Sequence, residues 1–120
     1  MLKDWQEITR NYTTATREVR NGAPDVMRSF GAIAQAAMKP GALEPKTKEL
    51  VALAISVAIR CDPCIGFHAE GAVKQGASRA EVLETIGTAI YMGTGPSAMY
   101  AAAALEAYDQ FAAARAAAAD

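Results

Sequence analysis

The chain has 120 residues, of which 52% are hydrophobic, and a formal net charge of −1 at pH 7. This length fits one domain over residues 1–120, and a chain this apolar is also expected to bury surface in a homo-oligomer. No cluster of Lys or Arg is present, which argues against binding of nucleic acid or of an anionic membrane surface.

Alanine is abundant, β-branched residues are sparse, and no segment alternates polar and apolar residues with a period of two. The chain is therefore predicted to be all-α, with about six helices. The first helix is expected over about residues 2–20. Its predicted core contacts are Trp5, Ile8, Tyr12 and Val19. Pro24 suits the first turn of a second helix that runs to about Met38.

Pro45 suits the start of a third helix, which includes residues 50–59, apolar apart from Ser56. Because this run is apolar almost all round, the helix is predicted to be buried. A fourth helix is expected from Asp62 as N-cap and Pro63 as first helical residue. It should end near residue 76, a glycine suited to a helix stop.

Inside the fourth helix, Gly66 and Gly71 lower helix stability relative to alanine, so they are expected to permit close packing against a neighbour. Residues 78–81 (Ser-Arg-Ala-Glu) have the form of a capping box, which predicts the start of a fifth helix. The Gly-Thr-Gly-Pro segment at 93–96 is expected to break it. A last helix is predicted over about 97–114.

The chain carries no sign of export or membrane insertion. Residues 1–20 are charged throughout and lack the apolar centre of a secretory signal, and residues 50–59 make about half a membrane span. We therefore expect a cytoplasmic protein, in a compartment where structural disulfides are rare. A close cysteine pair is there more often catalytic or metal-binding than structural.

Both cysteines and the only histidine lie together, as Cys61-Asp62-Pro63-Cys64 with His68 four residues further on. A helix that begins at Asp62 or Pro63 places Cys64 in its first turn, where free N–H groups and the helix dipole favour a thiolate. His68 then shares a face with Cys64, with Cβ atoms about 5–6 Å apart, close enough for proton exchange. Cys61 is within reach of Cys64 for a disulfide.

Glu49 lies on the preceding helix beside an almost wholly apolar run, so it needs a partner if it is buried. It is a candidate to orient His68 or to relay its proton. Arg60 and Asp62 flank Cys61 with opposite charges. They act on the electrostatics of the site in opposite directions, and the sign of their net effect stays open. Phe67, next to His68, is the candidate for a pocket wall.

Two other interpretations remain open at this point. The cysteines and the histidine can simply pack in a helical core. Alternatively, Cys61, Cys64, His68 and Glu49 can supply four zinc ligands, although no second C-x-x-C or histidine pair supports a metal site. We expect neither a metal nor a cofactor.

The set Glu49, Cys61, Cys64 and His68 resembles the E…C-x-x-C-x-x-x-H signature of the alkylhydroperoxidase D-like (AhpD-like) branch of the carboxymuconolactone decarboxylase family. The flanking segments LEPKTKELVALAISVAIRC and HAEGAVKQGASRAEVLETIGTAI agree with it. The resemblance covers about residues 41–105. It implies an all-helical orthogonal bundle that assembles as a homo-oligomer, commonly a trimer or hexamer.

The resemblance also implies a thiol peroxidase. In that scheme the Cys64 thiolate, deprotonated through His68 and Glu49, attacks a hydroperoxide and becomes a sulfenic acid. Cys61 condenses with it to a disulfide, which an external dithiol on a lipoylated or thioredoxin-like protein reduces. The characterised peroxidase has a second histidine immediately before its second cysteine, where this chain has Pro63. The decarboxylase branch generally lacks the cysteine pair, so decarboxylation through His68 and Glu49 is the alternative.

Overall fold

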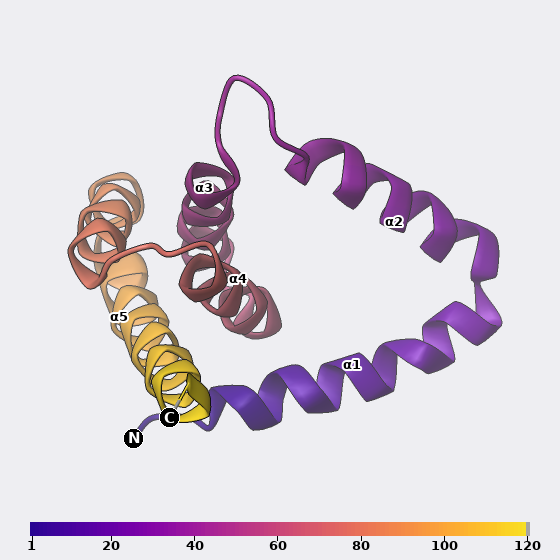
Figure 1. Cartoon of the computed structure of the whole chain (residues 1–120), viewed down its shortest axis with the longest axis horizontal. Coiled ribbons are helices and arrows are strands. Elements are labelled where there is room, and N and C mark those ends of the chain that lie inside the picture. Colours follow the sequence, from indigo (N-terminus) through magenta and orange to yellow (C-terminus); the bar gives the residue numbers. More distant parts are fainter. Residues whose placement is uncertain (120) are drawn as a thin grey trace.

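The computed structural model describes residues 1–119 and contains five helices and no strand over that range. The helices are α1 (Trp5–Gly22), α2 (Pro24–Met38), α3 (Pro45–Ala58), α4 (Asp62–Lys74) and α5 (Arg79–Ala119). In Figure 1, α3, α4 and α5 pack side by side, and α1 and α2 form an arm that extends from them. The all-α prediction is confirmed. None of the helices in the described range is long and apolar enough to cross a membrane.

The helix starts have local causes in the sequence. Asp4 caps α1 by accepting a backbone N–H at 3.0 Å, so α1 begins at Trp5 and not at residue 2 as predicted. Prolines stand at the first positions of α2 and α3, as predicted. The capping box of α5 is confirmed, because Ser78 and Glu81 exchange side-chain to backbone bonds of 3.1 and 2.8 Å.

The break predicted at residues 93–96 is present inside α5. Thr94 has non-helical angles, φ 51° and ψ −128°, and Pro96 lies two residues later. Helical turns continue directly before and after this kink, with no loop between them. The two helices predicted on either side of the break therefore form one kinked helix, and the structure has five helices where the sequence predicts about six. The helix also continues to Ala119, beyond the predicted end near residue 114.

The core lies between α3, α4 and α5 and is completed by the start of α1. The largest fully buried side chains are Trp5, Leu53, Ile65, Val57 and Val82. Small residues of α5 also belong to it, among them Ala101, Ala104 and Ala107. Their small size lets α5 approach α3 and α4 closely.

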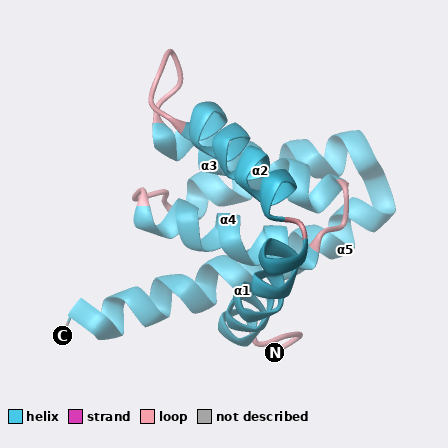
Figure 2. Cartoon of the chain, turned by 90° about the vertical axis from the view of Figure 1, so that its right-hand side faces the viewer, coloured by secondary structure: helices cyan, strands magenta, loops and turns pink. Residues whose placement is uncertain are grey.

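Two faces predicted to be buried are exposed. Tyr12 and Val19 of α1 are 49% and 50% exposed, because only the first turns of α1 pack on the core before the arm extends away. In Figure 2, α1 and α2 lie in front of the other helices.

The prediction that α3 is buried all round is also wrong. One of its faces packs on α4 and α5, whereas Val51 and Ile55 on another are 47% and 53% exposed.

Candidate functional site

The turn between α3 and α4 places Cys61 directly at the start of α4. The N–H of Arg60 donates to the Val57 carbonyl at 3.2 Å, and the N–H of Cys61 donates to the Ser56 carbonyl at 3.1 Å. These two bonds define a Schellman motif, whose left-handed position glycine usually occupies. Here Arg60 occupies it, with φ 59°. The last residue of the motif that ends α3 is therefore also Cys61, the residue from which α4 starts.

Cys61 is the N-cap of α4, and its Sγ accepts the N–H of Cys64 at 3.3 Å. The sequence predicts Asp62 as the cap and Pro63 as the first helical residue, and the helix starts one residue earlier than that. Cys61 has the extended backbone of a cap, φ −105° and ψ 101°, so Asp62 is already helical. Cys64 lies in the first turn, as predicted.

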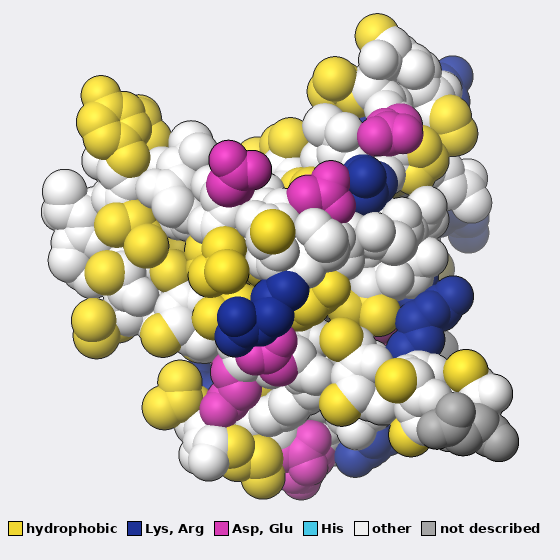
Figure 3. Space-filling model, turned by 60° about the vertical axis from the view of Figure 1, so that its left-hand side comes forward, with side chains coloured by type: hydrophobic (Ala, Val, Ile, Leu, Met, Phe, Trp, Pro, Cys, Tyr) yellow, Lys and Arg dark blue, Asp and Glu magenta, His cyan; other side chains and the backbone are white. Residues whose placement is uncertain are grey.

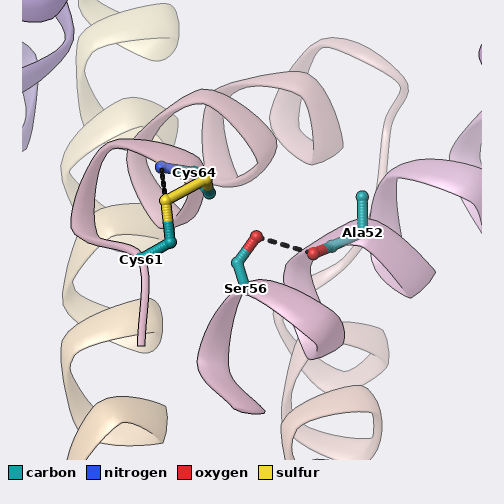
Figure 4. The surroundings of a disulfide bond; sticks show 4 residues. All are labelled: Ala52, Ser56, Cys61 and Cys64. Carbon is teal, nitrogen blue, oxygen red and sulfur yellow. Dashed lines mark hydrogen bonds between the residues drawn. A yellow bond between two sulfur atoms is a disulfide. The ribbon is translucent and has the colours of Figure 1, made fainter. Parts of the chain in front are cut away.

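The two cysteines form a disulfide, with Cα atoms 5.2 Å apart, as their spacing predicts. Figure 4 shows Ser56 of α3 beside it, a neighbour that is not predicted from the sequence. Ser56 is only 3% exposed, and its hydroxyl donates to the Ala52 carbonyl at 2.7 Å. A lone hydroxyl in an otherwise apolar run just before the cysteine pair is the signal that points to it.

Glu49 of α3 and His68 of α4 form a hydrogen-bonded pair, as the sequence predicts. His68 Nδ1 lies 2.8 Å from Glu49 Oε2. The two side chains are 20% exposed for Glu49 and 32% exposed for His68, so the pair lies at the edge of the core. When the neutral imidazole carries its proton on Nδ1 and donates it to Glu49, Nε2 is left free to accept a proton.

The two glycines inside α4 each admit a neighbour, which confirms the predicted close packing. A Cβ at Gly71 would overlap with the carboxylate of Glu49. A Cβ at Gly66 would lie 2.8 Å from Thr9 Cγ2 and 3.7 Å from the ring of Trp5. Gly71 therefore makes room for the partner of His68, and Gly66 makes room for α1.

Asp62, the charge between the two cysteines, has a cationic partner that the sequence does not indicate. Its carboxylate forms an ion pair with Lys3, 59 residues earlier in the chain. The hydrogen bond to Asp62 raises the pKa of Lys3. Arg60, the other charge next to the pair, is exposed.

The zinc-site interpretation and the predicted pocket wall can also be compared with the structure. No group of three or more His, Cys, Asp or Glu side chains within residues 1–119 is arranged to hold a metal ion. The four proposed zinc ligands instead form a disulfide and a hydrogen-bonded pair. Phe67 is 39% exposed and lines a groove between α1 and α4 with Thr9, Thr13 and other residues.

Sequence relatives cover most of the chain, including the segment that carries the candidate site. Residues 24–107 match the family model described as carboxymuconolactone decarboxylase family. An uncharacterized protein from Haemophilus influenzae is 42% identical over 108 residues, which cover 90% of this chain and 96% of that protein. Another from Cupriavidus necator is 40% identical over 86 residues, or 72% of this chain and 76% of that one.

Solved structures show the same fold. A carboxymuconolactone decarboxylase family protein from Legionella pneumophila has a TM-score of 0.87 and 52% identity, over 90% of this chain and 96% of that one. A protein of the same family from Thermotoga maritima, described with a possible role in the antioxidative response, has a TM-score of 0.77 and 29% identity, over 87% and 88% of the chains. Sequence and fold agree over most of the length, and the chain belongs to the carboxymuconolactone decarboxylase family.

Proposed function

We propose that this chain is a thiol peroxidase or disulfide oxidoreductase of the alkylhydroperoxidase D-like branch of the family, which reduces hydroperoxides through Cys61 and Cys64. The observation that carries the proposal is the 2.8 Å contact between Glu49 and His68, one helical turn from Cys64. Nucleophilic thiol chemistry requires a thiol with a base nearby and a third group that orients the base. The antioxidative role suggested for the Thermotoga maritima protein agrees with this chemistry.

In the first step, His68 removes the proton of the Cys64 thiol, and Glu49 stabilises the imidazolium that forms. The thiolate attacks the terminal oxygen of the hydroperoxide. A sulfur–oxygen bond forms, the oxygen–oxygen bond breaks, and the departing alkoxide takes the proton from His68 to leave as an alcohol. Cys64 is thereby oxidised to a sulfenic acid, and the peroxide is reduced.

In the second step, Cys61 attacks the sulfenic sulfur of Cys64, a disulfide forms, and water leaves. The N–H that Cys61 Sγ accepts from Cys64 supports negative charge on the attacking sulfur. An external dithiol, on a lipoylated or thioredoxin-like protein, then returns two electrons and two protons by thiol–disulfide exchange. The disulfide between the two cysteines is the product of the second step in this scheme.

We also propose that the chain works as a homo-oligomer. Within α2 no residue is buried, and Val26, Phe30 and Ile33 are 68%, 60% and 66% exposed. Hydrophobic side chains are spread over the face shown in Figure 3 as well. Apolar surface of this extent is typical of subunit interfaces.

Light scattering should give the mass of a trimer or hexamer, and Phe30→Glu should dissociate it. A monomeric wild-type protein would contradict the proposal.

Stopped-flow oxidation of the reduced protein by hydrogen peroxide and cumene hydroperoxide tests the peroxidase. The wild type should react faster than free cysteine near neutral pH. Cys64→Ser should abolish the reaction, and Cys61→Ser should stop at a sulfenic acid that dimedone traps. Glu49→Gln should slow the first step by about 10²-fold or more. Glu70→Gln is its matched control, because Glu70 pairs with Lys74 and not with His68.

Two results would count against this function. The first is a wild-type rate no higher than that of free cysteine. The second is turnover that survives the replacement of both cysteines by serine. Decarboxylation of a carboxylated ring that survives the same replacement would favour the decarboxylase alternative, in which His68 and Glu49 do the acid–base chemistry.

A further inference from the structure

The segment that precedes α1 is held on α5 by two polar side chains. Glu106 accepts the N–H of Leu2, the N–H of Lys3 at 2.9 Å and the indole N–H of Trp5 at 2.9 Å. Gln110 accepts the Trp5 N–H at 2.9 Å and donates to the Lys3 carbonyl at 2.7 Å. The ring of Trp5 is completely buried. The backbone of Lys3 is therefore fixed on both sides.

From this fixed backbone, the side chain of Lys3 reaches the first turn of α4. Its ammonium pairs with Asp62 and lies 5.8 Å from the centre of the Trp5 ring. The side chains are 45% exposed for Lys3 and 27% exposed for Asp62. Partial shielding from water makes the interaction of such a pair with nearby charges stronger than that of a fully exposed pair.

Asp62 stands between the two sulfur-bearing residues, next to Cys61 and two residues before Cys64. In the proposed cycle the disulfide is neutral, whereas the reduced site carries a thiolate. A carboxylate beside this thiolate disfavours the reduced form, and a cation paired with the carboxylate cancels that effect. Lys3 is thus placed to change the balance between the two redox states.

We propose that Lys3 is a positioning residue of the dithiol site, whose ammonium neutralises Asp62 and thereby favours the reduced, thiolate-bearing form of Cys61 and Cys64. The inference rests on the function proposed above. The relevant equilibrium is exchange with glutathione. Two glutathione thiols supply two electrons, the protein disulfide is reduced to the dithiol, and glutathione disulfide is released.

The test is the glutathione equilibrium of the full chain and of three variants. Lys3→Met leaves Asp62 uncompensated, and it should shift the equilibrium toward the disulfide by about threefold, the size of a partly exposed charge interaction. That factor corresponds to about 14 mV. Asp62→Asn should shift it toward the dithiol by a similar factor. The double variant should return to within about 1.5-fold of the wild type, because both charges are gone.

Lys74→Met is the matched control, since it removes the same charge at the other end of α4. The helix has 13 residues and is therefore roughly 20 Å long. This variant should leave the equilibrium unchanged. Opposite shifts that cancel in the double variant support the proposal. Shifts of the same sign overturn it, because loosening of the segment would act in one direction only.

The outcomes also separate this inference from the function on which it rests. A disulfide that exchanges reversibly with glutathione but ignores both charge changes overturns the role of Lys3 alone. Cysteines that do not exchange at all overturn the oxidoreductase, and the role of Lys3 with it. The fluorescence of Trp5, measured in each variant, reports whether the segment remains docked.

Discussion

Gly66 and Gly71 lie on the same helix, and each contacts a different neighbour. Gly66 contacts Thr9 of α1, a β-branched side chain with a stiff χ1 on a helix held by a buried tryptophan. Gly71 contacts the carboxylate of Glu49, the free end of a flexible side chain. An added methyl group meets a rigid wall in the first case and a movable group in the second. One glycine thus serves packing, and the other serves the position of the group that binds His68.

Gly71→Ala should have the largest effect, a loss of activity without a loss of stability. The methyl group displaces Glu49 from His68, so peroxide reduction should slow by about 10²-fold. Stability should be unchanged or rise by up to about 1 kcal/mol, because alanine favours the helix over glycine. Stopped-flow rates and urea unfolding of the same preparation check both parts. The double variant with Glu49→Gln should be no slower than Glu49→Gln, and additive losses would contradict the explanation.

Gly66→Ala should show the opposite pattern. Overlap with Thr9 should lower the free energy of unfolding by about 1–2 kcal/mol, while the rate per folded molecule stays near that of the wild type. Urea unfolding followed by Trp5 fluorescence measures the loss. Thr9→Ser removes the overlapping methyl group and keeps the hydroxyl that donates to the Gln6 carbonyl at 3.0 Å, so it should restore stability. An equal stability loss in Gly71→Ala would remove the contrast between the two glycines.

The turns at the two ends of α4 give a smaller test. At the C-terminal end, Gly76 has φ 80° and donates to Val73 at 3.0 Å, the pattern found at Arg60. Arg60→Gly should raise the free energy of unfolding by about 0.5–1 kcal/mol, and Gly76→Ala should lower it by about 1 kcal/mol, because a Cβ is strained in this conformation. Thermal unfolding should give shifts of opposite sign. Shifts of the same sign would show that the strain at Arg60 is relieved elsewhere.

The smallest effect is expected when the pH is lowered. It concerns the contact by which Glu106 of α5 holds the segment before α1. Burial raises the pKa of Glu106, but hydrogen bonds from Leu2, Lys3 and Trp5 outweigh it and hold that pKa below 4.5. Since the folded-state pKa is the lower one, this stabilisation is present above about pH 4.5 and is lost as the pH falls through the folded value. Trp5 fluorescence should then shift to the red. Glu106→Gln should remove this pH dependence, and an unchanged acid transition in that variant would argue against Glu106 as its origin.

Local rules predict most of the helix boundaries and one long-range contact. Proline and the capping box place the starts of α2, α3 and α5, because they act within a few residues of the chain. The contact between Glu49 and His68 is also predictable, since an acidic residue beside an apolar run needs a partner and the only histidine lies on the next helix. Among the helix starts, the predicted N-cap of α4 is wrong by one residue, because Cys61 and not Asp62 is the cap.

Other features depend on tertiary structure that no local pattern encodes. Nothing in the sequence links Lys3 to Asp62, because their contact depends on how α5 holds the N-terminal segment. An arginine at the left-handed position of a turn is not expected, because glycine is the usual signal. Hydrophobicity also does not reveal whether a face is covered within the chain, and the exposed side of α3 is therefore predicted wrongly.

The spacing of the two cysteines has one more consequence, for the energy of the whole fold. Their disulfide joins residues only three positions apart, so it closes a very small loop of chain. Constraining so short a loop removes little freedom from the unfolded state, worth about 2 kcal/mol by the chain-entropy relation, against about 4.7 kcal/mol for a loop of 100 residues. Opening the bond therefore costs the fold less than opening a disulfide that closes a long loop. We therefore expect the fold to survive reduction of the disulfide, as the proposed cycle requires.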